Sequence, residues 1–69
     1  MITSKELHER YFFEMENSKD ELYFSGKYGV LLYRNGDGFI PYYWKDGEFV
    51  PGKMFTELFE LDDIISNYS

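Results

Sequence analysis

Carboxylates are the most abundant chemically active side chains in this sequence. Thirteen of the 69 residues are Asp or Glu, whereas His8 is the only histidine and cysteine is absent. One imidazole without thiolates cannot complete a structural zinc site, and disulfides are excluded. A nucleophilic serine needs an oriented base within reach, yet His8 lies in a polar stretch where we expect a surface residue. The sequence therefore predicts no metal site, no cofactor and no catalytic residue.

Two further patterns in the sequence could suggest a functional site, but neither predicts one. Residues 35–38 have the composition of a calcium-binding loop, but the position of its bidentate glutamate falls on Trp44. A glycosidase-like pair of carboxylates needs a cleft, and a chain of 69 residues is poorly suited to form one. We therefore expect a protein that acts by binding, not an enzyme.

The charge of the chain is unevenly distributed. Residues 1–26 have six acids and three bases, for a net charge of −3; residues 27–53 have three acids and four bases, for +1; residues 54–69 have four acids and no base, for −4. A phosphate backbone is bound by a basic stripe, so direct binding of nucleic acid is not expected, nor is binding to anionic membranes. No apolar run approaches the ~20 residues that span a bilayer. The polar residues after Met1 do not resemble a signal peptide, so we expect a cytoplasmic protein.

The acidic C-terminal segment supplies the first candidate binding surface. Its carboxylates, which we call the acidic set, are Glu57, Glu60, Asp62 and Asp63. Further carboxylates near the start of the chain add to them, namely Glu6, Glu9, Glu14 and Glu16. One interpretation is a solvated helix face that keeps a small protein soluble. The other is an array that imitates DNA phosphates and occupies the basic groove of a nucleic-acid-handling protein.

An aromatic patch is the second candidate surface. Its members are Tyr42, Tyr43, Trp44 and Phe49. In a strand, alternate side chains point to opposite faces, so Tyr42 and Trp44 share one face and Tyr43 takes the other. If helices cover one face, the opposite face presents rings to solvent, as interaction sites often do. The alternatives are that both faces are covered within the chain or that the patch is the interface of a homodimer. Stacking of single-stranded nucleic acid would need a positive groove, which this segment lacks.

The N-terminal segment predicts a helix that positions the first acids. Thr3 and Glu6 form a capping-box pattern. An apolar stripe at four-residue spacing follows, formed by Leu7, Tyr11 and Met15. We expect this helix to end near Asn17-Ser18, and the alternative is a strand over Arg10–Glu16.

The middle of the chain predicts a meander of antiparallel strands. The expected strands are Glu21–Ser25, Tyr28–Arg34, Phe39–Trp44 and a short one after Asp46-Gly47. The apolar run of residues 30–33 predicts a strand buried on both faces. Pro41 cannot donate to a ladder and therefore predicts an edge or a bulge.

Two-residue turns are expected to set the registers of this meander. Gly26-Lys27 fits a type II′ turn, and Asn35-Gly36 and Asp46-Gly47 fit type I′ turns. The second turn would place Arg34 opposite Asp37 and Leu32 opposite Phe39. The third would place Lys45 opposite Glu48 and Trp44 opposite Phe49, which pairs opposite charges and two rings.

Residues 54–69 predict a second helix, because their apolar residues recur at intervals of four and three. The alternative for Met54–Glu60 is a fifth strand. The expected fold is a single α+β domain over residues 1–69, a small antiparallel β-meander of three to four strands flanked by an N-terminal and a C-terminal helix.

These features lead to two hypotheses of function. The first is a non-catalytic acidic protein-binding module that inhibits a basic nucleic-acid-handling protein through carboxylates that imitate DNA phosphates. Its motivation is the segregated charge of the last sixteen residues. The alternative is a structural or assembly protein that forms a homo-oligomer through an aromatic sheet face. Its motivation is the content of 15 aromatic residues, seven Phe, seven Tyr and one Trp, which exceeds what so short a chain readily encloses.

Overall fold

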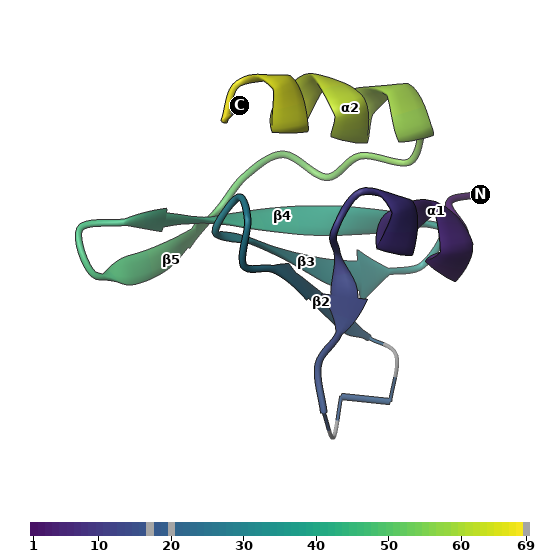
Figure 1. The fold of residues 1–69 in the computed structure, drawn as a ribbon, viewed down its shortest axis with the longest axis horizontal. Helices are drawn as coiled ribbons and strands as arrows, with labels where there is room; N and C mark the ends of the chain where they lie inside the picture. Colours follow the sequence, from purple (N-terminus) through teal and green to yellow (C-terminus); the bar gives the residue numbers. More distant parts are fainter. Residues whose placement is uncertain (17, 20, 69) are drawn as a thin grey trace.

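A five-stranded antiparallel sheet forms the centre of the protein, and both helices pack on the same side of it (Figure 1). The computed structural model describes residues 1–16, 18–19 and 21–68. The elements in chain order are α1 (Ser4–Glu9), β1 (Phe13–Glu14), β2 (Leu22–Ser25), β3 (Val30–Asn35), β4 (Gly38–Lys45), β5 (Glu48–Pro51) and α2 (Leu58–Ser66). The strands lie in the sheet in the same order. The predicted α+β fold, a meander with one helix before it and one after it along the chain, is therefore confirmed, but the sheet has five strands instead of three to four.

The helix α1 begins as predicted. The Thr3 hydroxyl accepts a hydrogen bond from the Glu6 amide, and the Glu6 carboxylate accepts one from the Thr3 amide at 2.8 Å. This reciprocal pair is the capping box, which satisfies two amides that the first helical turn leaves without carbonyl partners.

The same helix ends at Glu9, so the predicted end near residues 17–18 is wrong. Tyr11 adopts a left-handed conformation with φ 69°. The amides of Tyr11 and Phe12 then donate to the carbonyls of His8 and Leu7, at 3.1 and 2.9 Å. This pattern is a Schellman motif, whose left-handed position is usually glycine. A tyrosine at that position gave the sequence no recognisable stop signal.

The chain beyond the motif is extended, so that Phe13–Glu14 becomes the edge strand β1 beside β2. The alternative strand over residues 10–16 was thus right for these two residues alone. Leu7 is buried, but Tyr11 and Met15 are exposed, so the predicted helical stripe does not form. Asn17, one of the predicted end residues, lies outside the described residues.

The hairpin between β4 and β5 confirms its predicted register. Lys45 faces Glu48, and Trp44 faces Phe49. The two turn residues, Asp46 and Gly47, have φ of 50° and 85°, the left-handed pair that a type I′ turn requires.

The hairpin between β3 and β4 turns one residue later than predicted. Asn35 pairs with Gly38, so the turn consists of Gly36, with φ 60°, and Asp37. Arg34 therefore faces Phe39 and Leu32 faces Pro41, so the predicted pairings of Arg34 with Asp37 and of Leu32 with Phe39 are both wrong. Gly38 is fixed in the strand because a Cβ there would collide with the carbonyl oxygen of Phe55. The register moves by two residues, which leaves every side chain on its predicted face.

The connection between β2 and β3 is longer than predicted. Ser25 pairs with Val30, which leaves a four-residue loop over residues 26–29. Gly29, not Gly26, takes the positive φ of 70°, and its amide donates to the Ser25 carbonyl at 2.8 Å. The two-residue turn at Gly26-Lys27 was therefore wrong, because the second glycine closes the loop.

Pro41 does not lie on an edge strand, because β4 is between β3 and β5, but it lies where the pairing of β4 with the following chain is interrupted. Its carbonyl accepts from the Gly52 amide at 2.7 Å. The nitrogen of a strand residue faces the same neighbour as its carbonyl, so the missing N–H of Pro41 faces residues 52–54, which belong to no strand. Pairing resumes where Phe55 bridges Phe39.

This bridge also explains why α2 starts late. The helix was predicted from residue 54, but residues 54–57 are not helical and α2 begins at Leu58. The alternative strand over Met54–Glu60 is right only for the bridge at Phe55. The side chain of Phe55 is buried and stacks on Phe39, with ring centroids 6.0 Å apart. The predicted C-terminal end at Ser69 lies outside the described residues.

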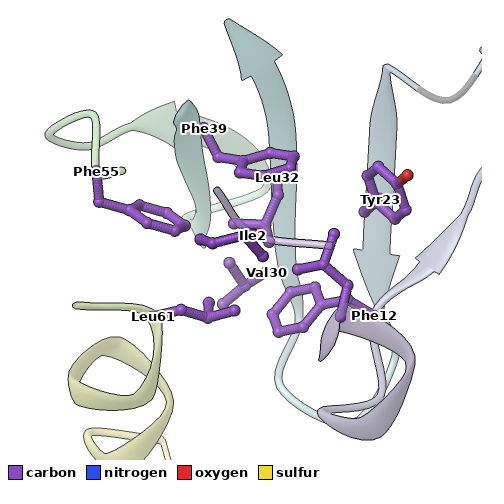
Figure 2. Close-up of a cluster of buried hydrophobic side chains, with 9 residues drawn as sticks. Ile2, Phe12, Tyr23, Val30, Leu32, Phe39, Phe55 and Leu61 are labelled. Carbon is purple, nitrogen blue, oxygen red and sulfur yellow. The ribbon is translucent and has the colours of Figure 1, made fainter. Parts of the chain in front are cut away.

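The core lies between the sheet and the two helices (Figure 2). Its buried apolar residues are Ile2, Leu7, Phe12, Tyr23, Val30, Leu32, Phe39, Phe55 and Leu61. On β3 only alternate residues belong to the core, because Leu31 is half-buried and Tyr33 is exposed. The prediction of a strand buried on both faces is therefore wrong, and none of the residues that the structure describes forms a layer over the other face of the sheet.

Candidate functional site

The uncovered side of the sheet is the first candidate site, and we call it the open face. Its longest row crosses all five strands through the paired residues Phe13, Phe24, Leu31, Tyr42 and Pro51. Shorter rows on either side of it are formed by Leu22, Tyr33 and Ile40, and by Trp44 and Phe49. All ten side chains are apolar or aromatic. The structure thus brings together residues from every strand.

The charged residues of the described strands all alternate to the opposite side of the sheet. They are Glu14, Arg34, Lys45 and Glu48. Glu14 pairs with buried Tyr23, and Arg34 pairs with buried Phe39. Lys45 follows Tyr43 by two residues and therefore shares its side. In most sheets with one solvated face, polar residues occupy that face, so the apolar open face departs from the usual pattern.

Several rings of the open face stand in solvent. The side chains of Trp44 and Phe13 are 58% and 54% exposed, and Tyr33 and Phe49 are exposed as well. Trp44 packs edge-on against Phe49, with centroids 5.0 Å apart, and Phe49 packs edge-on against Phe24 at 6.4 Å. The rings of Phe24, Phe49 and Trp44 therefore pack against one another on the open face.

The predicted aromatic patch divides between the two sides of the sheet. Tyr42, Trp44 and Phe49 lie together on the open face. Tyr43 lies on the other side, half-buried beneath α2, and its ring stacks on Tyr68 with centroids 5.9 Å apart. Burial raises the pKa of the Tyr43 hydroxyl above its ordinary value, and the neighbouring Tyr68 adds to that effect. Tyr43 is therefore part of the packing between α2 and the sheet.

Sequence reasoning missed most of the open face. Phe13 was assigned to a helix, and Leu31 and Tyr33 were assigned to a buried strand. The signal in the sequence was that β3 and β4 have apolar residues on both of their faces. Besides the core residues, β3 has Leu31 and Tyr33, and β4 has Ile40 and Tyr42. Such a strand fits a sheet covered on both faces equally well, and only the placement of both helices on one side distinguishes the two cases.

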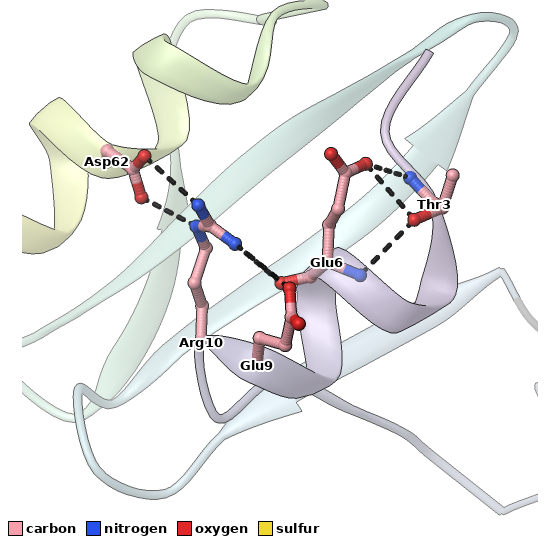
Figure 3. A network of polar contacts seen from close by, with 5 residues as sticks. All are labelled: Thr3, Glu6, Glu9, Arg10 and Asp62. Carbon is pink, nitrogen blue, oxygen red and sulfur yellow. Dashed lines mark hydrogen bonds and ion pairs between the residues drawn. The ribbon is translucent and has the colours of Figure 1, made fainter.

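The acidic set, by contrast, is largely engaged within the chain. The Glu60 carboxylate accepts hydrogen bonds from the amides of Thr56 and Glu57, both at 3.1 Å, ahead of the first turn of α2. Asp62 forms a two-pronged ion pair with Arg10, which also donates to the Glu6 carbonyl at 3.0 Å (Figure 3). Asp63 and the side chain of Glu57 are exposed. The four carboxylates therefore do not form one free surface.

Two of the N-terminal acids also have structural partners. The hydrogen bond from the Thr3 amide is the main reason that the pKa of Glu6 lies below its ordinary value. A 2.6 Å hydrogen bond between His8 Nε2 and Glu14 lowers the pKa of Glu14 in the same way. The His8 ring also stacks on Phe13, with centroids 5.5 Å apart. His8, expected to be a solvated surface residue, is exposed but joins α1 to β1.

A shallow cleft of about 220 Å³ lies between α2 and the segment before it. It is lined by Tyr43, Lys53, Met54, Phe55, Glu60, Asp63 and Ile64. Its volume is smaller than the ~300–1,000 Å³ of typical small-molecule sites. Among the described residues, no three metal-ligating side chains lie close enough to hold an ion. In the same part of the chain, neither helix is long and apolar enough to cross a membrane.

Comparison of the chain with models of protein families, with curated proteins and with solved structures finds no match in any of the three. The interpretation of the site therefore depends on its geometry and chemistry.

Proposed function

We propose that the chain is a non-catalytic protein-binding module and that it binds through the open face. The observation that carries this proposal is that the described strands place no charged residue on the open face, in a chain in which 29% of residues are charged. A contiguous apolar patch of this kind on a small protein usually marks an interaction surface. Tyr and Trp, which are enriched at binding hot spots, both contribute to it.

The hypothesis of an inhibitor that imitates DNA phosphates stays a prediction. Its four carboxylates include Glu60 and Asp62, which have partners within the chain. A basic partner would have to compete with these internal contacts, whereas a partner on the open face would displace only water. The open face is therefore the better supported of the two candidate surfaces.

Site-directed photocrosslinking tests the choice between the two surfaces. A photoreactive phenylalanine analogue is placed at Trp44 on the open face, or at Phe59 on α2 as the matched control, because Phe59 is an aromatic residue of similar exposure at 66%. Both full-length chains are irradiated alone and in an extract of the source cells. We expect protein adducts from position 44 and few from position 59. Adducts that form mainly at position 59, or at neither position, would contradict the proposal.

A further inference from the structure

The chemistry of the open face restricts what can cover it. A charged partner surface would lose its hydration against the open face and would find no opposite charge there, at a cost that apolar contact does not offset. A partner must therefore offer an uncharged, apolar surface of similar extent. The chain itself presents such a surface.

The net charge of −6 does not oppose association through the open face. The acids within the two helices lie on the other side of the sheet, as do Glu14 and Glu48 on the strands, whereas Asp37 and Asp46 lie in turns at the ends of the strands. Two copies joined at their open faces would keep these carboxylates in water and far from each other. Association through the helices would instead bring Glu57, Asp62 and Asp63 of one copy toward the same acids of the other.

The area of the open face suits a dimer. The exposed fractions of Phe13, Tyr33, Trp44 and Phe49, applied to side chains of about 150–250 Å² each, give roughly 300–500 Å² of exposed ring surface per copy. Specific interfaces bury about 800 Å² per partner, and those of weaker complexes are somewhat smaller. The exposed rings therefore supply the area of a weak dimer, below that of a standard interface.

We infer that the occupant of the open face is a second copy of this chain, an inference that rests on the proposed function. The two sheets would pack face to face about 10 Å apart around a twofold axis, with helices outside on both sides. Leu31 and Tyr42, in the middle of the longest row, would lie near the centre. Phe13, on the edge strand β1, and Trp44, on β4 beside the other edge strand β5, would lie at its margins.

Sedimentation equilibrium of the full chain tests this inference. A series from about 1 to several hundred micromolar brackets the affinity expected of an interface of this size. We expect the mass to rise from 8.3 kDa toward twice that value. Trp44 is the only tryptophan, so its fluorescence should shift to shorter wavelengths over the same concentrations. Trp44→Lys and Phe13→Lys should each weaken association on the order of 100-fold, because each would bury an unpaired charge. Phe59→Lys, the control on α2, should leave it unchanged.

The outcomes separate the inference from the proposed function. A monomer throughout the series, or a dimer that Trp44→Lys and Phe13→Lys leave intact while circular dichroism shows them folded, overturns the inference. If such a monomer still crosslinks another protein from position 44, the open face remains a binding surface and only the identity of the occupant is wrong. If position 44 gives no adduct of either kind, both proposals fail.

Discussion

Arg10 and Asp62 lie 52 positions apart in the sequence and join the end of α1 to α2. The Nε and Nη2 atoms of Arg10 contact the two Asp62 oxygens at 2.6 and 3.3 Å. The hydrogen bond with Asp62 is the main reason that the pKa of Arg10 lies above its ordinary value. Two-pronged geometry of this kind fixes the direction of both side chains. The pair therefore joins two helices that pack on the same side of the sheet.

Removal of this ion pair should lower the stability of the protein modestly. The side chain of Asp62 is 51% exposed, so screening by solvent limits the expected loss for Asp62→Asn to roughly 0.5–1 kcal/mol. The loss should shrink as salt is added. Urea unfolding at two ionic strengths measures it. Asp63→Asn is the control, since its carboxylate has no ion pair among the described residues, and equal losses for the two variants would contradict the structural role of Asp62.

Acid should destabilise the protein through Glu6 and Glu14. The pKa of each is below the ordinary value of 4.5 in the folded chain, so each stabilises the fold while ionised. This stabilisation is complete above about pH 4.5 and is lost as the pH falls through the lower folded pKa. Unfolding curves across this range should show a shallower acid limb for Glu6→Gln and Glu14→Gln. Glu16→Gln, which removes an exposed carboxylate, should follow the wild type; an unchanged slope in all three would refute the assignment.

The sequence predicted those elements whose local signals are strong. Thr3 and Glu6 fixed the start of α1, and Asp46-Gly47 fixed the register of β4 and β5, because both signals act between neighbouring residues. The end of α1 could not be predicted, since it depends on Tyr11 in a conformation that tyrosine rarely adopts. The start of α2 depends on the bridge between Phe39 and Phe55, a contact between segments that are distant in sequence. The open face exists because both helices pack on the same face of the sheet, which no local signal in the sequence predicts. Of its residues, only Tyr42, Trp44 and Phe49 were predicted as a candidate surface.

Gly38 should not tolerate a side chain. A Cβ at this position would collide with the Phe55 carbonyl and would lie within 2.9 Å of the Met54 side chain. Gly38→Ala should therefore lower the free energy of unfolding by roughly 1–3 kcal/mol, as overpacking does. At Gly26 the nearest atom is 4.0 Å away, so Gly26→Ala should be nearly neutral. Denaturant unfolding of the two variants gives the comparison, and a neutral Gly38→Ala would mean that the segment around Phe55 is not held against β4.

The orientation of α2 is tested by two residues of the same helix. Leu61 is fully buried, whereas Phe59 is 66% exposed. Leu61→Ala should cost about 2–4 kcal/mol, because it leaves a cavity against the core. Phe59→Ala should change the stability by less than about 0.5 kcal/mol. Thermal unfolding at a single low protein concentration measures the stability of both variants. A larger loss of stability for Phe59→Ala than for Leu61→Ala would mean that α2 buries the face with Phe59 and not the face with Leu61.

The meander in which each strand pairs with its neighbour in the sequence has a kinetic consequence. Every ladder closes a short loop, so the entropy lost at each pairing is small and the sheet can form rapidly. The helix α2 must instead return across the sheet to reach α1, and this is a long-range closure. We therefore expect α2 to dock after the rate-limiting step. In stopped-flow experiments Leu61→Ala should then mainly accelerate unfolding, whereas Gly47→Ala in the turn before β5 should mainly slow folding.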